Sequence, residues 1–446
     1  MTAPLRIAWA GPLREGSAIG REGVRIATGL AARGHGVELI ATDHEWGAAT
    51  PRIASDLPLR HWSQLHLHDL PTMFDSVVVN VGDHFLHHAG VFPLLAHAPC
   101  LAVVHDVFLG NLFNGWLWAD GSRPGVRGEV MLQTYGPEGL ELARRYEAGE
   151  LPLEEQAQRA PMTEWVARRA AGCLAHAPFY LPRLLASCAG PVDVAGLPVA
   201  SRGVAPLPER GDQAPVAVTV GHMNPNKCVD RVIEAIASRT ELRERLDYRL
   251  VGPIAPEESS RLKALAGRLG YRRLSVEGSA TEAELDGALA AADIIVALRR
   301  PVLEGASGSA VEALLAGRPT VVADAGFYAG LPDDVAVKVP ADIPVGKLAE
   351  ALSALVADPV RRRALGERAR AFAERGFNLD AYLDVLEPLM RATAAAAPVL
   401  RMSRGLGARL AELGLRRDDP AVARISETLG PLFGDQASQG ERSAAG

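Results

Sequence analysis

Residues 304–317 read EGASGSAVEALLAG, a loop of small and polar residues that continues into an apolar run and ends at a glycine. Serine and glycine at 307–309 are residue types that cap and open helices, so the pattern predicts a helix over 308–316. Unpaired N–H groups and the positive end of the dipole at the start of that helix favour a bound phosphate. We therefore expect Gly305, Ala306, Ser307 and Gly308 to hold a phosphate group.

Two glutamates flank this loop. Glu304 and Glu312 are eight positions apart, which separates them by roughly 12 Å if the intervening chain is helical. A diphosphate fits between them, and we expect Glu304 to hold hydroxyls on one side of it and Glu312 to hold a ribose diol on the other. The ligand implied is a nucleotide sugar, although two glutamates near a short helix are more often part of a solvated face.

The neighbouring sequence favours a site. The strand-like residues 294–297 precede Glu304, which places it at the carboxyl end of a buried strand, where ligands bind in open α/β sheets. Gly317-Arg318-Pro319 and a second apolar run, 320–323, follow. With these flanks the segment resembles the E-x7-E signature of the retaining family-4 glycosyltransferases, which have the GT-B fold.

Composition limits the class of protein. The 446 residues suffice for two or three domains, and a formal charge of −6 with a pI near 6.1 argues against a general nucleic-acid binder. The four cysteines include no C-x-x-C pair, which suits a reducing cytosol. The N-terminus does not resemble a signal peptide, and no apolar run reaches membrane-spanning length. We expect a cytoplasmic protein, with peripheral attachment to the inner face of a membrane left open.

Strand-like and helical segments alternate in two series, which predicts α/β domains with parallel sheets covered on both faces. Gly, Pro and charged residues accumulate between 199 and 215, and we place a domain boundary there. The predicted units are a Rossmann-like domain over 1–205, a second over 206–375, helices over 376–434 and a disordered tail over 435–446. With the GT-B resemblance, these are two doubly wound domains facing each other across a cleft. The first would bind the acceptor and the second the donor.

Glycines follow the first strand-like run, residues 5–10. The spacing of Gly16 and Gly20 is not G-x-G-x-x-G and indicates only a close backbone approach. In the resembling family this loop faces the cleft, which implies a phosphate or acceptor role for both glycines. A tight turn explains them equally well.

Two further buried strands, 76–81 and 100–104, each end in polar residues. The first leads into Asp83 and the second into His105 and Asp106, so both deliver titratable groups to the same edge of the sheet. The resemblance implies that His105 contacts the donor sugar or the reacting centre. The alternative is a histidine with satisfied hydrogen bonds at a strand end.

The loop at 221–227 follows another strand-like run, 216–220, and we expect a helix to start at Lys227. A lysine in a first turn is unfavourable unless an anion is bound. The resembling family carries a lysine here, with an arginine earlier in the loop, and both grip the diphosphate. Lys227 matches, whereas His222 stands where the arginine is expected; it could still donate a hydrogen bond. Asp324 also matches a family position.

No D-x-D motif occurs in the sequence. Transferases that hold a diphosphate through a divalent ion use such aspartates, so we expect no required metal or other cofactor. Lys227 and the helix N-terminus would instead balance the negative charge of the diphosphate. Histidines capable of binding zinc lack a spaced carboxylate or cysteine partner. They are His66, His68, His84, His87 and His88.

Near the C-terminus, Leu406, Leu410 and Leu413 recur at helical spacing among arginines. A basic amphipathic helix of this kind can lie on an anionic membrane, and packing against a domain is the alternative.

The resemblance implies a metal-independent glycosyltransferase that moves a sugar, with retention, from a nucleotide-diphosphate donor to a hydroxyl of a saccharide or lipid-linked saccharide. Glu304, Lys227 and His105 would be its catalytic residues. Two alternatives are another two-domain nucleotide-sugar enzyme, such as an epimerase, and a catalytically silent partner that binds the donor. The substitution at His222 keeps the second alternative open.

Overall fold

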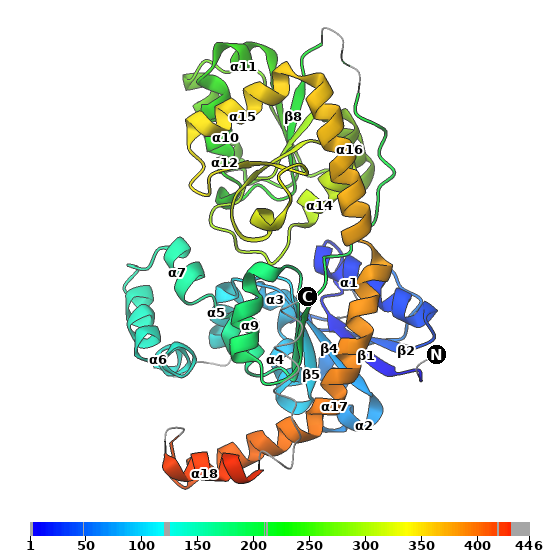
Figure 1. Cartoon of the computed structure of the whole chain (residues 1–446), viewed down its shortest axis with the longest axis vertical. Coiled ribbons are helices and arrows are strands. Elements are labelled where there is room, and N and C mark those ends of the chain that lie inside the picture. The colour runs from blue at the N-terminus through cyan, green and yellow to red at the C-terminus, as the bar shows by residue number, and fades with distance from the viewer. Residues whose placement is uncertain are drawn as a thin grey trace.

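The computed structural model describes residues 3–47, 49–119, 125–208, 210, 213–416 and 419–429. Two α/β domains are stacked along the long axis of the molecule, and a long helix near the C-terminus returns to the first domain (Figure 1). The first domain contains a seven-stranded sheet in the order β3-β2-β1-β4-β5-β6-β7, with every pairing parallel. Its strands are β1 Arg6–Gly11, β2 Gly36–Ala41, β3 Leu59–His61, β4 Ser76–Val81, β5 Cys100–Val104, β6 Gly172–Ala175 and β7 Val192–Val194.

The second domain contains a six-stranded parallel sheet in the order β10-β9-β8-β11-β12-β13. Its strands are β8 Val216–Val220, β9 Asp247–Val251, β10 Leu274–Gly278, β11 Ile294–Val296, β12 Thr320–Ala323 and β13 Val337–Val339. The strand order reverses between β1 and β4 in the first sheet and between β8 and β11 in the second. Ligands of doubly wound folds bind at such reversals, outside the carboxyl ends of the strands. The predicted α/β architecture is confirmed.

Helices cover both sheets. Those of the first domain are α1 Ala18–Ala32, α2 Leu70–Met73, α3 Phe85–His88, α4 Val91–His97, α5 Gly110–Ala119, α6 Val126–Glu147, α7 Leu153–Arg159, α8 Thr163–Ala167 and α9 Leu181–Ser187. Those of the second are α10 Val229–Ala237, α11 Thr240–Arg245, α12 Pro256–Arg268, α13 Glu282–Ala291, α14 Gly308–Leu315, α15 Val345–Ala357 and α16 Pro359–Gly376, followed by α17 Leu379–Glu412 and α18 Pro420–Leu429. Short 3-10 turns are η1 Trp62–Gln64, η2 Leu67–Asp69, η3 Pro178–Tyr180, η4 Pro225–Lys227 and η5 Gly326–Gly330.

The central strands are buried on both faces, as their apolar sequences predict. Every residue of β4 and β5 is buried, including two polar side chains, Ser76 and Asn80, and Asn80 is 1% exposed. A buried amide must find hydrogen-bond partners. The partners of Asn80 lie at the site described below.

The two domains are in direct contact. One apolar core runs across their junction and includes Tyr180 from the first domain and Tyr328 from the second. The loop after β5 is bonded to the loop after β11: Val107 and Phe108 both donate N–H groups to the Leu303 carbonyl at 2.9 Å. Gly305 N–H donates to the His105 carbonyl at 2.7 Å. The two segments predicted to carry the chemistry are therefore held together through their backbones.

The predicted boundary between residues 205 and 206 falls in the segment that connects β7 to β8. Two arginines hold this connecting segment in place. Arg318, fully buried, donates to the carbonyls of Leu289 at 2.8 Å and Ala205 at 2.6 Å. Arg370 reaches the Val204 carbonyl at 3.3 Å. Because these side chains also bond the last turns of α13 and α14, the connecting segment is fixed on the second domain.

Helix α17 runs without a break through the alanine-rich residues 394–397. Alanine is the best helix former, and the helix keeps a buried face there. Tyr382, Leu386 and Met390 pack in the same core as Trp9 and Ile26 of the first domain.

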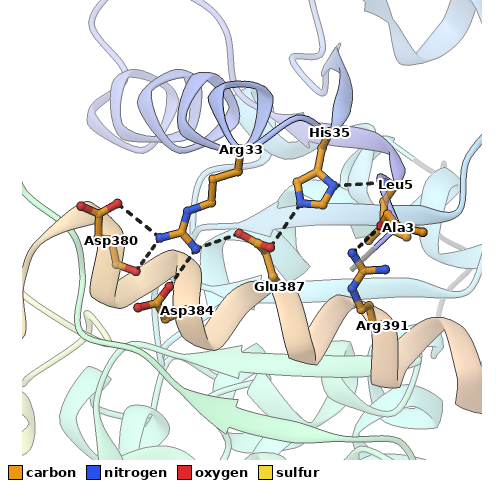
Figure 2. Close-up of polar contacts among 8 residues, drawn as sticks. All are labelled: Ala3, Leu5, Arg33, His35, Asp380, Asp384, Glu387 and Arg391. Atoms are coloured by element: carbon orange, nitrogen blue, oxygen red, sulfur yellow. Dashed lines mark hydrogen bonds and ion pairs between the residues drawn. The ribbon is translucent and has the colours of Figure 1, made fainter. Parts of the chain in front are cut away.

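Charged contacts secure the start of α17 on α1 (Figure 2). Arg33, which caps α1, pairs with Asp380 at 3.2 Å and with Asp384 and Glu387 at 2.8 Å each. Glu387 also contacts His35 Nε2 at 3.3 Å. The C-terminal helix thus completes the first domain after the chain has formed the second.

The last part of α17 extends away from the first domain, and α18 lies beside its end (Figure 1). Met402 is 51% exposed and Leu413 is 75% exposed, whereas Leu406 and Leu410 are half-buried. Arg404 donates to the Ala170 carbonyl at 2.8 Å. Packing against the domain is therefore limited in this segment, contrary to one of the two predicted alternatives. The predicted disordered tail, 435–446, lies outside the described residues.

Candidate functional site

A cavity of about 660 Å³ lies between the two domains. The first domain contributes the start of α1 and the loops after β5 and β6, and the second contributes the end of β8, the start of α13 and the start of α14. The connecting segment closes one side with Val199, Ala200 and Arg202. The cavity therefore meets both sheets at their points of strand-order reversal.

The start of α14 forms part of the wall. Ser307 caps the helix by accepting the Ala310 N–H at 3.3 Å, and Ala306, Gly308 and Ser309 line the cavity. The helix begins at Gly308, as the sequence predicts. Its first N–H groups and its positive dipole end thus lie at the cavity wall, where an anion would be stabilised.

Glu312 lines the cavity one turn further along α14. Its carboxylate accepts two hydrogen bonds from Arg202, from Nη2 at 2.8 Å and from Nε at 3.1 Å. Arg202 also pairs with Glu282 at 2.6 Å and Asp286 at 2.9 Å. The sequence analysis did not identify Arg202, which belongs to the connecting segment and lies far from Glu312 in the sequence.

Glu304 is held behind the wall and does not line the cavity. Its carboxylate pairs with Arg299 Nε at 2.9 Å and accepts the Tyr328 hydroxyl at 2.8 Å. Gly305 has no room for a side chain, because an added Cβ would lie 2.6 Å from the Tyr180 hydroxyl. Arg299 was also missed, although its position three residues after β11 gave a signal.

Lys227 is buried beside the cavity lining. Its side chain is buried and its Nζ donates to the carbonyl of Val220, a lining residue. Burial, with a smaller contribution from the nearby Arg299 charge, lowers the pKa of Lys227 to about 7. The prediction that a helix starts at Lys227 is wrong: Lys227 ends the turn η4, Cys228 has a φ of 53°, and α10 begins at Val229.

His222 is exposed, and its side chain has no polar partner among the described residues. Lys227 and Glu304 instead interact electrostatically with Arg299, whose side chain is buried. The basic partner beside Lys227 therefore comes from the end of β11 rather than from the loop after β8.

His105 lines the cavity, and both nitrogens of its ring are engaged in hydrogen bonds. Asn80 Nδ2 donates to the Ala10 carbonyl, which turns Asn80 Oδ1 toward His105 Nε2 at 2.9 Å and makes that nitrogen the donor. His105 Nδ1 faces His176 Nε2 at 3.1 Å. Burial holds the pKa of His105 well below its usual value, so the ring is neutral at pH 7. It is a hydrogen-bonded histidine at a strand end that also faces the cavity.

Asp106 and Asp83 form a carboxyl pair beside His105, at the edge where the sequence analysis placed them. The Asp83 N–H donates to Asp106 Oδ2 at 2.8 Å, and Asp106 lines the cavity. Asp83 accepts the Leu112 N–H at 2.9 Å and the Asn111 amide at 2.8 Å. Burial raises the pKa of Asp106 to about 7 and that of Asp83 to about 8.

The remaining predicted residues lie elsewhere. Gly16 has a φ of 92° in the loop before α1, a conformation that favours glycine, and does not line the cavity. At Gly20 an added Cβ would lie 2.3 Å from the Pro12 carbonyl, so that glycine permits close packing. Asp324 is exposed after β12 and is also absent from the lining.

The described residues contain no group of three or more His, Cys, Asp or Glu side chains placed to hold a metal ion. In the same part of the chain, no helix is long and apolar enough to cross a membrane.

Residues 208–372 match the family model described as "Glycosyl transferases group 1". A search of curated proteins found no significant match. Among solved structures, the chain resembles a sucrose-phosphate synthase from Thermosynechococcus elongatus, with 18% identity and a TM-score of 0.58 over 87% of this chain and 99% of that one.

Two other structures are similar in fold. HepE from Anabaena, solved with UDP-glucose, gives a TM-score of 0.58 at 14% identity over 86% of this chain and 99% of that one. A glycosyltransferase from Rickettsia africae gives 0.57 at 13% identity over 88% of this chain and 99% of that one. These likenesses confirm the GT-B fold. The match of residues 208–372 to the glycosyl transferases group 1 model supports a glycosyltransferase enzyme.

Proposed function

We propose that this protein transfers a sugar from a nucleotide-diphosphate sugar to an acceptor hydroxyl, with retention and without a required metal. One observation carries the proposal: the start of α14, Glu312 and His105 line one cavity, and the Lys227 amine is bonded to the carbonyl of Val220, another lining residue. A diphosphate at the start of α14 would meet a helix dipole and a lysine together.

In this arrangement Glu312 binds the ribose diol and Gly305, Ala306, Ser307 and Gly308 surround the diphosphate. Arg299 and Tyr328 fix the Glu304 carboxylate behind the cavity wall, and the proposal requires this carboxylate to reach the sugar when the donor binds. His105, held by Asn80 and His176, lies beside the sugar. For Glu312 to bind the diol, the Arg202 guanidinium that it holds at 2.8 Å has to shift or share the carboxylate. The proposal keeps Gly16, His222 and Asp324 as donor contacts, although none of the three lines the cavity.

Charge stabilisation drives the reaction in this account. A nucleoside diphosphate is a weakly basic leaving group, so fixed positive charge can replace a strong general acid as the anomeric bond breaks. Lys227 and the α14 N-terminus supply that charge. Attack on the same face of an oxocarbenium-like sugar gives retention.

The acceptor is a saccharide or a lipid-linked saccharide, bound on the first-domain side of the cavity. The four cysteines are buried thiols, which suits a reducing compartment. We place the protein in the cytoplasm, with contact at the inner face of a membrane when the acceptor is lipid-linked.

The test begins with a panel of UDP-, GDP-, ADP- and dTDP-sugars, scored by thermal stabilisation. A ligand at 100 times its Kd adds about 2.7 kcal/mol to the free energy of unfolding. One base class should stabilise the protein, and the wild-type enzyme should then release the nucleoside diphosphate and give a new glycoside of unchanged anomeric configuration. An epimerised donor would identify an epimerase, binding without turnover would identify a silent partner, and no stabilisation by any donor would overturn the proposal.

A further inference from the structure

One face of helix α1 forms part of the cavity wall on the first-domain side. Ala18, Arg21, Glu22 and Arg25 all line the cavity. They lie three, four and seven positions apart along the helix, which places them on one side of it. The other side packs into the core of the first domain through Ile26. Helix α1 thus brings two arginines from the first domain to the cavity.

This face of α1 is directed at α14 of the second domain. Burial, with a smaller contribution from the Glu312 charge, raises the pKa of Glu22, so the two carboxylates interact across the cavity. Arg21 also interacts electrostatically with Glu22. Glu312 lies one turn along α14 from the proposed diphosphate site at the start of that helix. Arg21 is therefore on the wall that faces this site from the other domain.

The three arginines that line the cavity differ in their ionic partners. Arg25 Nη2 pairs with Glu22 at 2.7 Å, and Arg202 Nη2 pairs with Glu312 at 2.8 Å. Arg21 is exposed, and within the part of the chain that the structure describes its guanidinium has neither a hydrogen bond nor an ion pair. Carboxylates of the protein balance the charges of Arg25 and Arg202. Arg21 is the lining arginine that remains available to a ligand.

The second domain supplies few cations for a diphosphate. His222, which stands in the loop after β8 where the resembling family carries an arginine, is exposed and is not among the lining residues. Arg299, the buried arginine beside Lys227, is bonded to Glu304 at 2.9 Å. Lys227 and the dipole of α14 are then the positive groups on that side. A diphosphate carries several negative charges, so a further cation would strengthen its binding.

We propose that Arg21 is this further cation and binds the diphosphate of the donor from the first-domain wall. The inference rests on the proposed glycosyl transfer and adds a donor-binding residue to it. The planar guanidinium can donate to two phosphate oxygens at once, and it stays charged throughout, so it exchanges no proton in this role. Lys227 and α14 belong to the second domain and Arg21 to the first. The bound diphosphate therefore contacts both walls of the cavity.

The main experiment is calorimetry with the free nucleoside diphosphate of the base selected by the thermal panel, on the wild type and on Arg21→Met. The variant should bind this ligand about 10- to 100-fold more weakly, the loss expected for a hydrogen bond between charged groups. The parent nucleoside, which has no phosphate, should bind both proteins equally in a competition titration. Arg21→Lys should recover part of the affinity, because lysine keeps the charge without the fork. Since Arg21 is exposed, the melting temperatures of all three proteins should agree.

Arg14→Met is the matched control. Arg14 lies in the loop before α1, pairs with Glu45 at 3.8 Å and does not line the cavity. Its replacement removes the same charge from the same domain, and the variant should bind the nucleoside diphosphate as the wild type does. An equal loss of affinity in Arg14→Met and Arg21→Met would show that overall charge, rather than a contact with Arg21, sets the affinity, which overturns the inference.

The remaining outcomes separate the inference from the proposed function. A loss confined to the diphosphate in Arg21→Met, with nucleoside binding kept, supports the inference. Unchanged diphosphate affinity in Arg21→Met overturns it and leaves glycosyl transfer standing; slower transfer by that variant would then assign Arg21 to an anionic acceptor. A wild-type protein that binds no nucleoside diphosphate and releases none from any donor overturns the proposed function, and the inference with it.

Discussion

Asp106 of the first domain and Glu304 of the second face each other in an antiparallel backbone bridge, although 198 positions of sequence separate them. The Gly305 N–H and the His105 carbonyl, the residues that follow and precede them, extend the same pairing at 2.7 Å. The catalytic groups of the proposed mechanism are therefore aligned by the junction between the domains. A change that separates these loops should disturb chemistry and stability together.

Replacing Gly305 by alanine tests that junction. The new Cβ would lie 2.6 Å from the Tyr180 hydroxyl and 2.9 Å from the His105 carbonyl, and overpacking of this kind costs about 1–3 kcal/mol. We expect a lower melting temperature and slower transfer. Gly308→Ala is the control, since nothing lies within 4 Å of the added Cβ there and alanine is the better helix former. Equal melting temperatures for the two variants would mean that the junction does not constrain Gly305.

Two adjacent arginines give a second comparison. Arg299 pairs with Glu304 with side chains 10% and 17% exposed, whereas Arg300 pairs with Glu154 at 3.4 Å with side chains 38% and 44% exposed. Arg299→Met leaves a partly buried carboxylate unpaired and should cost about 3–5 kcal/mol, while Arg300→Met should cost at most about 1 kcal/mol. Chemical denaturation measures both. Similar losses would contradict the role assigned to the Arg299–Glu304 pair.

Lys227 should take up a proton when the diphosphate binds. With a pKa of about 7, the free enzyme carries Lys227 mostly neutral at pH 8. A bound diphosphate favours the charged amine and raises that pKa, so binding at pH 8 draws in up to one proton. Calorimetry in two buffers of different ionisation enthalpy counts the protons, and Lys227→Met should remove the uptake. Uptake that persists in Lys227→Met would assign the proton to another group.

Metal independence is a separate prediction. Transfer should continue at its full rate in excess chelator, because Lys227 and the start of α14 are expected to carry the diphosphate charge. Activity lost on chelation and restored by manganese would contradict this. Repeating the assay with magnesium in place of manganese separates a requirement for manganese from a general effect of ionic strength.

The sequence predicted the parts of this site that depend on neighbouring residues. Ser307 and Gly308 open α14 where capping preferences place the start, and the apolar runs before Glu304 and His105 form buried parallel strands. The local pattern failed at Lys227, where the left-handed Cys228 delays the helix to Val229.

Partners brought together by folding could not be read from local patterns. Arg202 meets Glu312 from a segment 110 positions earlier, and Asn80 meets His105 from the neighbouring strand. Arg299 lies close to Glu304 in sequence, but only the turn after β11 brings its guanidinium back onto the carboxylate. Arg202, Asn80 and Arg299 set the charge and orientation of the predicted residues. Local sequence patterns therefore identified the predicted residues, but not the partners that folding brings to them.

The central claim is that a nucleotide sugar lies across the 304–312 loop with its sugar at Glu304 and its ribose at Glu312. Calorimetry with the free nucleoside diphosphate, beside initial rates with the full donor, tests it on Glu304→Asp and Glu312→Asp. Glu304→Asp should slow transfer and leave the affinity for the free diphosphate almost unchanged, because that ligand lacks the sugar. Glu312→Asp should weaken the diphosphate and the donor alike by about 1–3 kcal/mol, the cost of a buried hydrogen bond left unmade. Identical profiles for the two variants, or normal transfer by Glu304→Asp, would contradict this placement of the donor.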